Sequence, residues 1–349
     1  ADTLTEGAAG VDFTLGKPLE GGLQIDTLDM LLDPEGAKVS PQLPNTSVVA
    51  TINGVEVGKG TVTDGESAVG SDVTNVVRNS IESGNWGAAA HLLTTYLAND
   101  LCVAVSEYTR QLIVGEATLL DAEHGTDFAE QCRRRIEISY PAINARQFTD
   151  LDPGTTDGAL AARGLSRDGY VLFLSRLSEA KGVDDLIDGY SRSAASQRVR
   201  LVVAGNGPEA PRLREVAAAS TVADRIEFLD DVSDEEKPHL MAGSAAFVLP
   251  SKPIPDFIET FGIALVESML AGGGPVITTT TGGIGEAVGD CALLIGVEDP
   301  AGIAAALDHA VLEMTDAERV ALRDCALRHA LQFDRTAVYE RLLARIPAP

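Results

Sequence analysis

The second half of the chain alternates short apolar runs with amphipathic stretches, and no other feature constrains its fold as strongly. Each run has the length of a strand, and helical periodicity or a polar turn follows it. The runs that we predict as strands are residues 170–175, 200–204, 225–229, 245–249, 275–278 and 292–295. Strands that alternate with helices are typical of a parallel sheet covered on both faces. The sequence therefore predicts a doubly wound α/β domain from about Gly169 onward.

Residues 1–140 have a less regular pattern, and residues 1–45 show no dependable period. We predict strands at residues 48–52, 100–105 and 136–139, and helices at residues 79–98 and 117–135. The chain has 349 residues, which exceeds the usual size of one domain. We therefore expect two domains that meet near residue 150.

The composition excludes several classes of partner. The net charge of −25 argues against nucleic acid, because phosphate binding needs clustered Lys and Arg, and it disfavours docking on an anionic membrane. No apolar run approaches the roughly 18 residues of a membrane span, and the first residues lack a signal-peptide pattern. We expect a cytoplasmic protein without stable membrane association. The lack of an initiator Met hints at residues upstream of Ala1.

The cysteines and histidines give no sign of a metal site. The four cysteines include no Cys-x-x-Cys pair, which favours unpaired thiols in a reducing cytoplasm over disulfides or zinc. The five histidines include no His-x-x-x-His pair, and none stands in a hydrolase-like setting. We expect no metal and no chemical role for these histidines. The residues concerned are Cys102, Cys132, Cys291, Cys325, His91, His124, His239, His309 and His329.

Two carboxylates stand eight positions apart on an otherwise apolar segment. Glu259 precedes a predicted helix start, and Glu267 lies two turns along the helix, where a carboxylate costs free energy unless hydroxyl or amide donors satisfy it. The amides of Phe261, Gly262 and Ile263 are free donors at the positive end of this helix, which suits a phosphate or a sugar oxygen. A sugar attached to a nucleoside diphosphate offers both partners. A sugar-nucleotide site is therefore the leading hypothesis.

Arg176 and Lys181 stand on either side of the turn that follows the first predicted strand of the second half. Two cations at this spacing can clamp a diphosphate, Arg as a fork and Lys as a point charge. The alternative is a pair of surface charges near Glu179 and Asp184. Ligands of doubly wound sheets bind outside the carboxyl ends of the strands, so the position favours the clamp.

Two glycine pairs follow predicted strands. Gly205 and Gly207 would let the backbone approach a flat ligand, but a plain turn is as good an interpretation. The third glycine of a dinucleotide fingerprint is missing, which argues against NAD. For Gly282 and Gly283, with Glu286 nearby, the structural interpretation is preferred.

In order along the chain, these segments resemble the retaining glycosyltransferases of family 4, which have the two-domain GT-B fold. The matching segments are residues 104–109, 174–182, 203–208, 248–251, 259–267, 275–277 and 282–283. The resemblance implies two Rossmann-like, doubly wound domains that face a cleft, with an abbreviated amino-terminal domain. It assigns residues 1–150, completed by a last helix at residues 333–349, to the acceptor side. Residues 151–332 are expected to bind the nucleotide sugar.

The resemblance also assigns a role to each motif. It implies that Arg176 and Lys181 hold the donor diphosphate, that Glu259 grips hydroxyls of the transferred sugar, and that Glu267 binds the ribose hydroxyls. Arg176, Lys181 and Glu259 form the expected catalytic set. Residues 228–232 are expected to line the nucleoside pocket. The further donor-binding residues are Gly205, Asn206, Gly207, Val232, Phe261, Gly262, Ile263 and Ala264.

The implied reaction is transfer with retention at the anomeric carbon, from a nucleoside-diphosphate sugar to a small soluble polar acceptor. No metal and no cofactor is expected, because two cations and a helix terminus stabilise the leaving diphosphate. The only Asp-x-Asp, at residues 150–152, falls in the predicted linker. Closure of the domains would exclude water.

The chain departs from the family pattern mainly in its first half. Asn53 stands where members often carry a histidine beside the sugar, and an amide cannot carry a charge. Gly21 and Gly22 are candidate remnants of a glycine loop facing the donor. These departures favour a second hypothesis, a catalytically weak relative that binds a sugar nucleotide or a partner protein. A sugar-nucleotide epimerase is a third. The base, the sugar, the acceptor and a homo-oligomeric state are left open.

Overall fold

The computed structural model describes residues 73–254 and 257–345 and, before residue 73, the backbone of strands β1 to β7. The chain forms two compact units. The first contains Ala1–Ala104 and Thr109–Glu137, and the second contains Val105–Tyr108 and Ile138–Pro349.

The strands described at the start of the first unit pair antiparallel, unlike those of a doubly wound sheet. One sheet contains β1 (Thr3–Gly7), β2 (Gly10–Thr14) and β4 (Leu28–Met30), and another contains β3 (Leu23–Ile25), β5 (Thr46–Ile52), β6 (Val55–Thr63) and β7 (Glu66–Ser67). The expected strand at residues 48–52 is β5. Asn53, Gly21 and Gly22 lie outside the described residues.

Two glycines divide the helices predicted for the first unit. The helix expected at residues 79–98 is two helices, α1 (Val73–Glu82) and α2 (Trp86–Leu97), and the helix expected at residues 117–135 is α3 (Glu107–His124) and α4 (Phe128–Arg135). Gly84 and Gly125 lie in these breaks with φ of 73° and 66°, a left-handed conformation that glycine adopts without steric cost. β8 (Cys102–Ala104) and β9 (Ile136–Ile138), which were both predicted, form a two-stranded sheet.

The second unit is built on a six-stranded sheet in which every neighbouring pair is parallel. Its strands, in their order across the sheet, are β12 (Ile226–Leu229), β11 (Arg200–Ala204), β10 (Tyr170–Leu174), β13 (Ala246–Leu249), β14 (Val276–Thr278) and β15 (Leu293–Leu294). All the predicted strands of this half are confirmed. The order reverses between β10 and β13, which is the switch point of a doubly wound fold.

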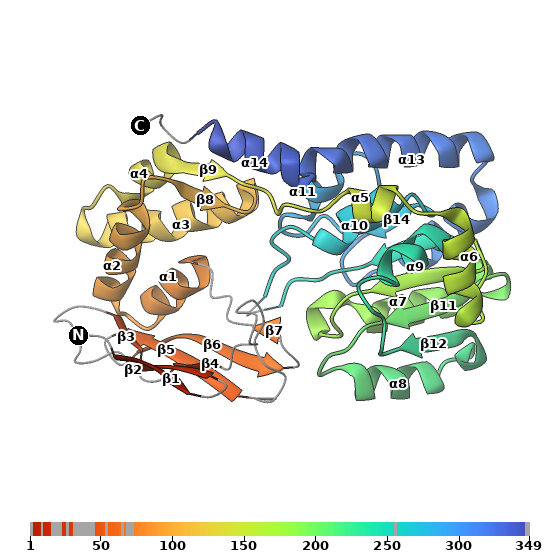
Figure 1. The fold of residues 1–349 in the computed structure, drawn as a ribbon, viewed down its shortest axis with the longest axis horizontal. Helices are drawn as coiled ribbons and strands as arrows, with labels where there is room; N and C mark the ends of the chain where they lie inside the picture. Colours follow the sequence, from red (N-terminus) through yellow and green to blue (C-terminus); the bar gives the residue numbers. More distant parts are fainter. Residues whose placement is uncertain are drawn as a thin grey trace. The chain divides into compact units, whose positions relative to one another are not determined.

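The helices of this unit form two groups of mutual contacts, as expected for layers that cover both faces of a parallel sheet (Figure 1). One group contains α7 (Val183–Arg192), α8 (Ala210–Ala218) and α12 (Pro300–Asp308). The other contains α5 (Arg146–Thr149), α6 (Pro153–Ala162), α9 (Lys237–Gly243), α10 (Ile263–Ala271), α11 (Ile284–Val288) and α13 (Asp316–Ala330). The last helix is α14 (Arg335–Leu343).

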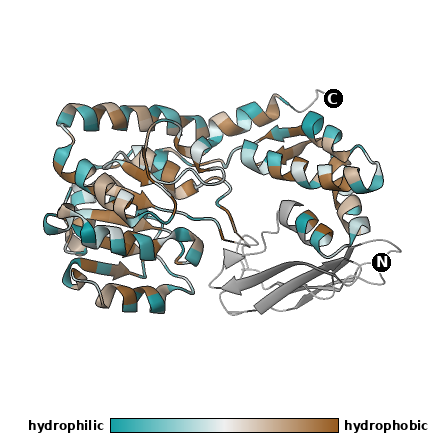
Figure 2. Cartoon of the chain, turned by 180° about the vertical axis from the view of Figure 1, so that it is seen from behind, coloured by the Kyte–Doolittle hydropathy of each residue, from teal (hydrophilic) through white to brown (hydrophobic). Residues whose placement is uncertain are grey.

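The core of the second unit lies between these layers, and its strands are the most apolar part (Figure 2). Leu172 and Phe173 of β10, Val202 of β11 and Phe247 of β13 are fully buried. Burial of a side chain of this size stabilises the fold by about 1.5–3 kcal/mol. Continuous apolar runs therefore mark strands that are covered on both faces.

The cysteines correct one expectation from the sequence. Cys291 and Cys325 form a disulfide, so the prediction of four unpaired thiols is wrong for this pair, while Cys102 and Cys132 are free and buried. The two half-cystines are 34 residues apart and meet because α13 packs against α10 and α11. Cysteine usage therefore does not support a reducing compartment. Among the described helices, none combines the length and the hydrophobicity that a bilayer span requires.

Candidate functional site

A cavity of about 470 Å³ opens in the second unit at the carboxyl ends of β10 and β13, beside the switch point. Many of the predicted site residues line it, and we call it the switch-point cavity. They are Lys181, Glu259, Phe261, Gly262, Ile263, Ala264 and Glu267. Leu174, Ser175 and Leu249 at the strand ends, together with Lys237, also contribute to the lining.

The remaining predicted residues lie outside this lining. Arg176 is exposed on the turn after β10. Gly205 and Gly207 pack their backbone against that turn, since an added Cβ would lie 2.1 Å from the Ser175 carbonyl oxygen and 2.2 Å from that of Leu177. Because both residues lack a Cβ, their backbone can pack closely against the turn that carries Arg176 and Lys181 and hold it in place. Asn206 and Val232 belong to the neighbouring loops, where the Asn206 carbonyl accepts a hydrogen bond of 2.7 Å from the Leu177 amide.

Lys181 reaches the cavity from a short 3₁₀ turn, Glu179–Lys181, and its ammonium group pairs with the Glu259 carboxylate. Both side chains are largely buried, and the Lys181 Nζ also lies 5.2 Å from the centre of the Phe257 ring. Gly182 follows with φ of 65°, and a Cβ there would lie 2.2 Å from the Pro250 carbonyl oxygen. Only glycine lets this turn pass so close to the end of β13.

The first turn of α10 faces the cavity without a side-chain cap. The helix begins at Ile263 after Gly262, whose φ is 97°, and none of the described side chains caps it. The leading amides of a helix have no partner within the helix and carry partial positive charge. This end of α10 can therefore bind an anionic or strongly polar oxygen.

Glu267 lies one turn after Ile263 on the same face of α10, so its carboxylate lines the cavity while Leu265 and Val266 enter the core. Its Oε1 accepts a hydrogen bond of 2.8 Å from the Nζ of Lys237. Burial raises the pKa of Glu267, because it disfavours the charged form; Lys237 opposes this shift and Asp234 adds to it.

Lys237 is the residue that sequence reasoning missed. It is the first residue of α9 and follows the acidic stretch after β12, so it shares with Lys181 a position between a strand end and a helix. That shared position is the sequence signal that could have identified Lys237 as a site residue. The contact with Glu267 depends on the packing of α9 against α10, which local sequence does not reveal.

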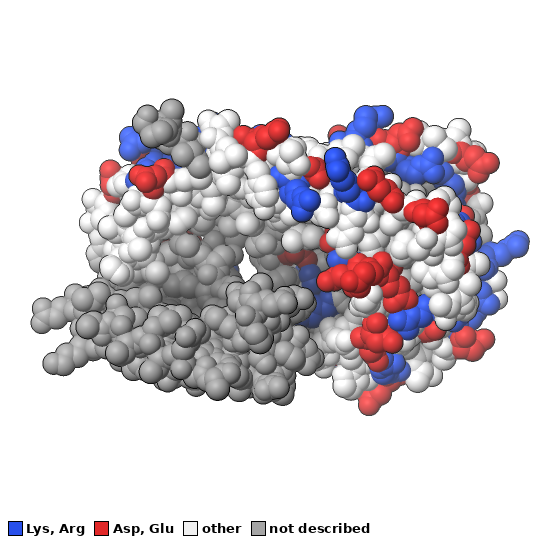
Figure 3. Space-filling view, viewed as in Figure 1, with Lys and Arg blue, Asp and Glu red and all other residues white. Residues whose placement is uncertain are grey.

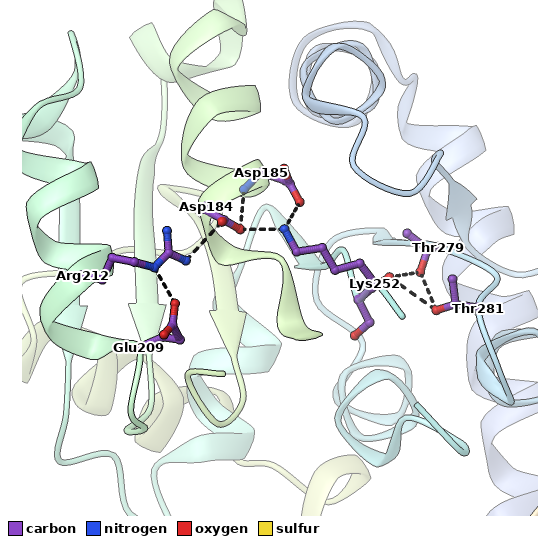
Figure 4. A network of polar contacts seen from close by, with 8 residues as sticks. Asp184, Asp185, Glu209, Arg212, Lys252, Thr279 and Thr281 are labelled. Atoms are coloured by element: carbon purple, nitrogen blue, oxygen red, sulfur yellow. Dashed lines mark hydrogen bonds and ion pairs between the residues drawn. The ribbon is translucent and has the colours of Figure 1, made fainter. Parts of the chain in front are cut away.

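A buried polar network supports the turn that carries Lys181 (Figure 4). The Nζ of Lys252, after β13, lies 3.2 Å from Asp184 Oδ1 and 2.9 Å from Asp185 Oδ2, and Arg212 lies 3.1 Å from the other oxygen of Asp184. Burial by itself would raise the pKa of Asp184, but Lys252 and Arg212 hold it below its usual value. The Lys252 amide also donates to the Ala180 carbonyl at 2.8 Å. The start of α7 is thereby fixed to the end of β13.

Glu286 and Asp152 have structural partners. Glu286 accepts hydrogen bonds from the amides of Glu107 (2.7 Å) and Tyr108 (2.9 Å) and from the Tyr140 hydroxyl (3.1 Å). This agrees with the structural interpretation of the segment around Glu286. Asp152, from the Asp-x-Asp, caps α6 through the Thr155 amide at 2.7 Å.

Neither a metal site nor a basic patch is evident in the described part of the molecule. Its His, Cys, Asp and Glu side chains form no group of three or more that could hold a metal ion. On the face of the second unit drawn in Figure 3, acidic and basic side chains are interspersed. The cations that line the switch-point cavity, Lys181 and Lys237, are both paired with carboxylates.

Comparison with known proteins identifies a family match within the second unit and several relatives of similar sequence. Residues 162–323 match the family described as "Glycosyl transferases group 1". The D-inositol 3-phosphate glycosyltransferase of Salinispora tropica is 30% identical over 252 residues, which cover 64% of this chain and 50% of that protein. The mannosylfructose-phosphate synthase of Agrobacterium fabrum is 33% identical over 207 residues, covering 57% and 41%. The chain spans about half the length of two of the D-inositol 3-phosphate glycosyltransferases it matches, those of Corynebacterium urealyticum and Salinispora tropica.

Solved structures share the fold at low identity. HepE of Anabaena, in complex with UDP and glucose, superposes with a TM-score of 0.61 at 19% identity, over 78% of this chain and 74% of that one. WaaG, a glycosyltransferase involved in lipopolysaccharide biosynthesis, superposes with a TM-score of 0.58 at 19% identity, over 77% and 69%. At these identities the likeness concerns the fold alone.

Proposed function

Residues 162–323 match the group 1 glycosyl transferases and the chain has the GT-B fold, and from these findings we propose that it is a glycosyltransferase that transfers a sugar from a nucleoside diphosphate to a small polar acceptor. The proposed reaction retains the configuration at the anomeric carbon and needs no metal ion or cofactor. Residues 151–332 bind the donor, and residues 1–150 with the last helix, 333–349, bind the acceptor. The proposed setting is the cytoplasm, where nucleotide sugars are made.

One observation carries this proposal. Lys181, Glu259, the uncapped first turn of α10 and Glu267 line a single cavity at the switch point of a doubly wound sheet. A nucleotide sugar presents a diphosphate, sugar hydroxyls and ribose hydroxyls, and this cavity offers a cation, free amides and two carboxylates. The volume of about 470 Å³ is in the range of small-molecule sites.

Each group then has a place in the reaction. Lys181 and the amides of α10 bind the diphosphate, Glu259 binds hydroxyls of the transferred sugar, and Glu267 binds the ribose. Arg176 joins Lys181 on the diphosphate from the exposed side. The loop residues that border the nucleoside are Gly205, Asn206, Gly207 and Val232.

The proposed chemical step balances without a protein base. The bond between the anomeric carbon and the diphosphate oxygen breaks as the acceptor oxygen bonds to the same face of that carbon, and the acceptor's proton passes to the leaving diphosphate. Negative charge develops on the diphosphate, where Lys181 and the helix amides stabilise it. The names of two relatives, a D-inositol 3-phosphate glycosyltransferase and a mannosylfructose-phosphate synthase, favour a small phosphorylated polar acceptor.

The test is product analysis. The protein is mixed with UDP-, GDP- and ADP-sugars and a panel of polyols and sugar phosphates, with EDTA present, and products are identified by mass spectrometry and NMR. We expect a glycoside with the donor's anomeric configuration, formed about 100-fold more slowly by the Lys181→Ala variant. Nucleotide binding without transfer or donor hydrolysis would instead support the catalytically weak relative. An inverted product would reject retention.

A further inference from the structure

The ion pair between Lys237 and Glu267 lies within the switch-point cavity. Both side chains line the cavity, and 2.8 Å separates Nζ from Oε1. The Glu267 side chain is 12% exposed and that of Lys237 is 21% exposed. Within the described residues no hydrogen bond reaches the other carboxylate oxygen, Oε2, so one oxygen is held and one is available.

The position of Lys237 is set by its surroundings. It is the first residue of α9, and its ammonium lies 5.8 Å from the centre of the Phe148 ring of α5. The titratable groups that face Glu267 are Lys237 of α9 and Asp234 of the preceding loop. Lys181 and Glu259, elsewhere in the cavity lining, are paired with each other. Lys237 is therefore the cation that holds Glu267.

A purely structural role does not account well for this pair. α9 and α10 already pack through apolar residues, among them Met241 and Leu270, which are almost fully buried. A partly buried ion pair contributes little to the free energy of unfolding, because the desolvation of both charges offsets most of their attraction. An ammonium group at the amino end of a helix is also electrostatically unfavourable. These costs are understandable if the carboxylate must stay charged to bind a ligand.

We propose that Lys237 is a positioning residue for the donor ribose: it keeps the Glu267 carboxylate ionised and oriented through Oε1, so that Oε2 accepts hydrogen bonds from the ribose hydroxyls. This rests on the proposed function, since it presupposes a nucleoside diphosphate in the cavity. The donor preference that follows is for ribonucleotides over 2′-deoxyribonucleotides. Removal of the cation leaves a carboxylate that protonates more easily and turns more freely, so both the affinity and the preference decrease.

The experiment measures the affinities of UDP, GDP and ADP, and of their 2′-deoxy forms, by calorimetry. The variants are Lys237→Met, which keeps the length of the side chain but removes its charge, and Lys237→Arg, which keeps the charge. Arg78→Met is the matched control: it removes the 3.1 Å ion pair between Arg78 and Glu116 in the first unit, and these two side chains are 27% and 13% exposed, close to those of Lys237 and Glu267.

We expect the wild-type protein to prefer the ribonucleotide by about tenfold, as the loss of a hydrogen bond to a charged group predicts. In Lys237→Met the ribonucleotide affinity falls about tenfold and the preference falls to about twofold or less. Lys237→Arg retains most of both, and Arg78→Met leaves both unchanged. Because Lys237 lowers the pKa of Glu267, the loss of ribonucleotide affinity at acid pH sets in at a higher pH in Lys237→Met than in wild type.

Three results would overturn this role: an unchanged preference in Lys237→Met, an affinity that rises because the ammonium competes with ribose, or an equal loss in Arg78→Met. If wild-type protein binds none of the three nucleotides, the proposed sugar transfer fails and this inference fails with it. If wild type binds and transfers while Lys237→Met keeps the preference, only the role of Lys237 is rejected.

Discussion

Lys181 and Glu259 form an ion pair inside the switch-point cavity although 78 residues separate them in the chain. The turn after β10 brings the lysine, and the segment before α10 brings the glutamate. The two opposite charges neutralise each other, and both side chains are largely buried. A diphosphate and a sugar would offer each group a second partner.

Replacement of Lys181 by Met tests the cation in this pair. It should lower kcat/KM for the donor by about 100-fold, because the developing charge on the diphosphate loses a preorganised partner. Arg192→Met, which breaks the surface pair with Asp188 on α7, is the control and should leave kcat/KM unchanged. Steady-state kinetics checks both. Equal kinetics for Lys181→Met and wild type would remove Lys181 from the reaction.

Replacement of Glu259 by Gln should lower turnover more than donor affinity. The sugar distorts in the transition state, and hydrogen bonds to its hydroxyls strengthen there, so their loss affects kcat. We expect a decrease in kcat of about tenfold or more, with donor KM nearly unchanged. A rise in KM at constant kcat would show instead that Glu259 only binds the ground state.

Replacement of Glu267 by Gln should have the opposite kinetic signature. Ribose contacts are the same in the ground and transition states, so donor KM should rise about tenfold while kcat changes little. The pKa of Glu267 is raised by burial, so this group favours folding fully below its unfolded pKa, and that contribution is lost as pH rises through the folded pKa. The Gln variant should therefore unfold at a similar or higher temperature at neutral pH, as calorimetry can show. A large drop in Tm would indicate a structural role.

Replacement of Lys252 by Met should destabilise the second unit by about 2 kcal/mol at neutral pH, because it leaves Asp184 and Asp185 without their buried cation. The pKa of Asp184 lies below its usual value, so the stability it contributes is present above the unfolded pKa and is lost as pH falls through the folded one. The difference between wild type and variant in urea unfolding should accordingly shrink below about pH 4. A difference that is independent of pH would mean that packing, and not charge, is lost. Arg192→Met, on the helix α7 that also carries Asp184 and Asp185, should change stability far less, because the ion pair of Arg192 with Asp188 is exposed.

The disulfide between Cys291 and Cys325 can be checked by counting the reactive thiols of the protein. In denaturant without reductant, two of the four cysteines should react, and all four should react after reduction. Closure of the loop between Cys291 and Cys325 should stabilise the unit by about 4 kcal/mol, and this stability should be lost equally in reduced protein and in Cys325→Ala. Cys132→Ala, in the first unit, keeps this disulfide and should lose the same stability on reduction as wild type. Four reactive thiols in the unreduced protein would contradict the pairing.

Local sequence was sufficient for the strands of the second unit. Residues 170–174 and 200–204 read as strands because a parallel strand is buried on both faces and must be apolar throughout. The helices of the first unit were joined in error at Gly84 and Gly125, because a glycine within a periodic stretch does not by itself reveal a left-handed conformation. The spacing of Glu259 and Glu267 is also local, so it predicted one carboxylate just before a helix start and a second one two turns along the helix.

Tertiary structure decided which charges meet. The sequence by itself determined the apolar periodicity, and with it the sheet, its switch point and the placement of Lys181 at a strand end. Only the packing of α9 against α10 brings Lys237 to Glu267, and only the packing of α13 against α11 brings Cys325 to Cys291. The physical reason is that periodicity reports which face of an element is buried, whereas the partner of a charge or a thiol depends on how distant elements pack.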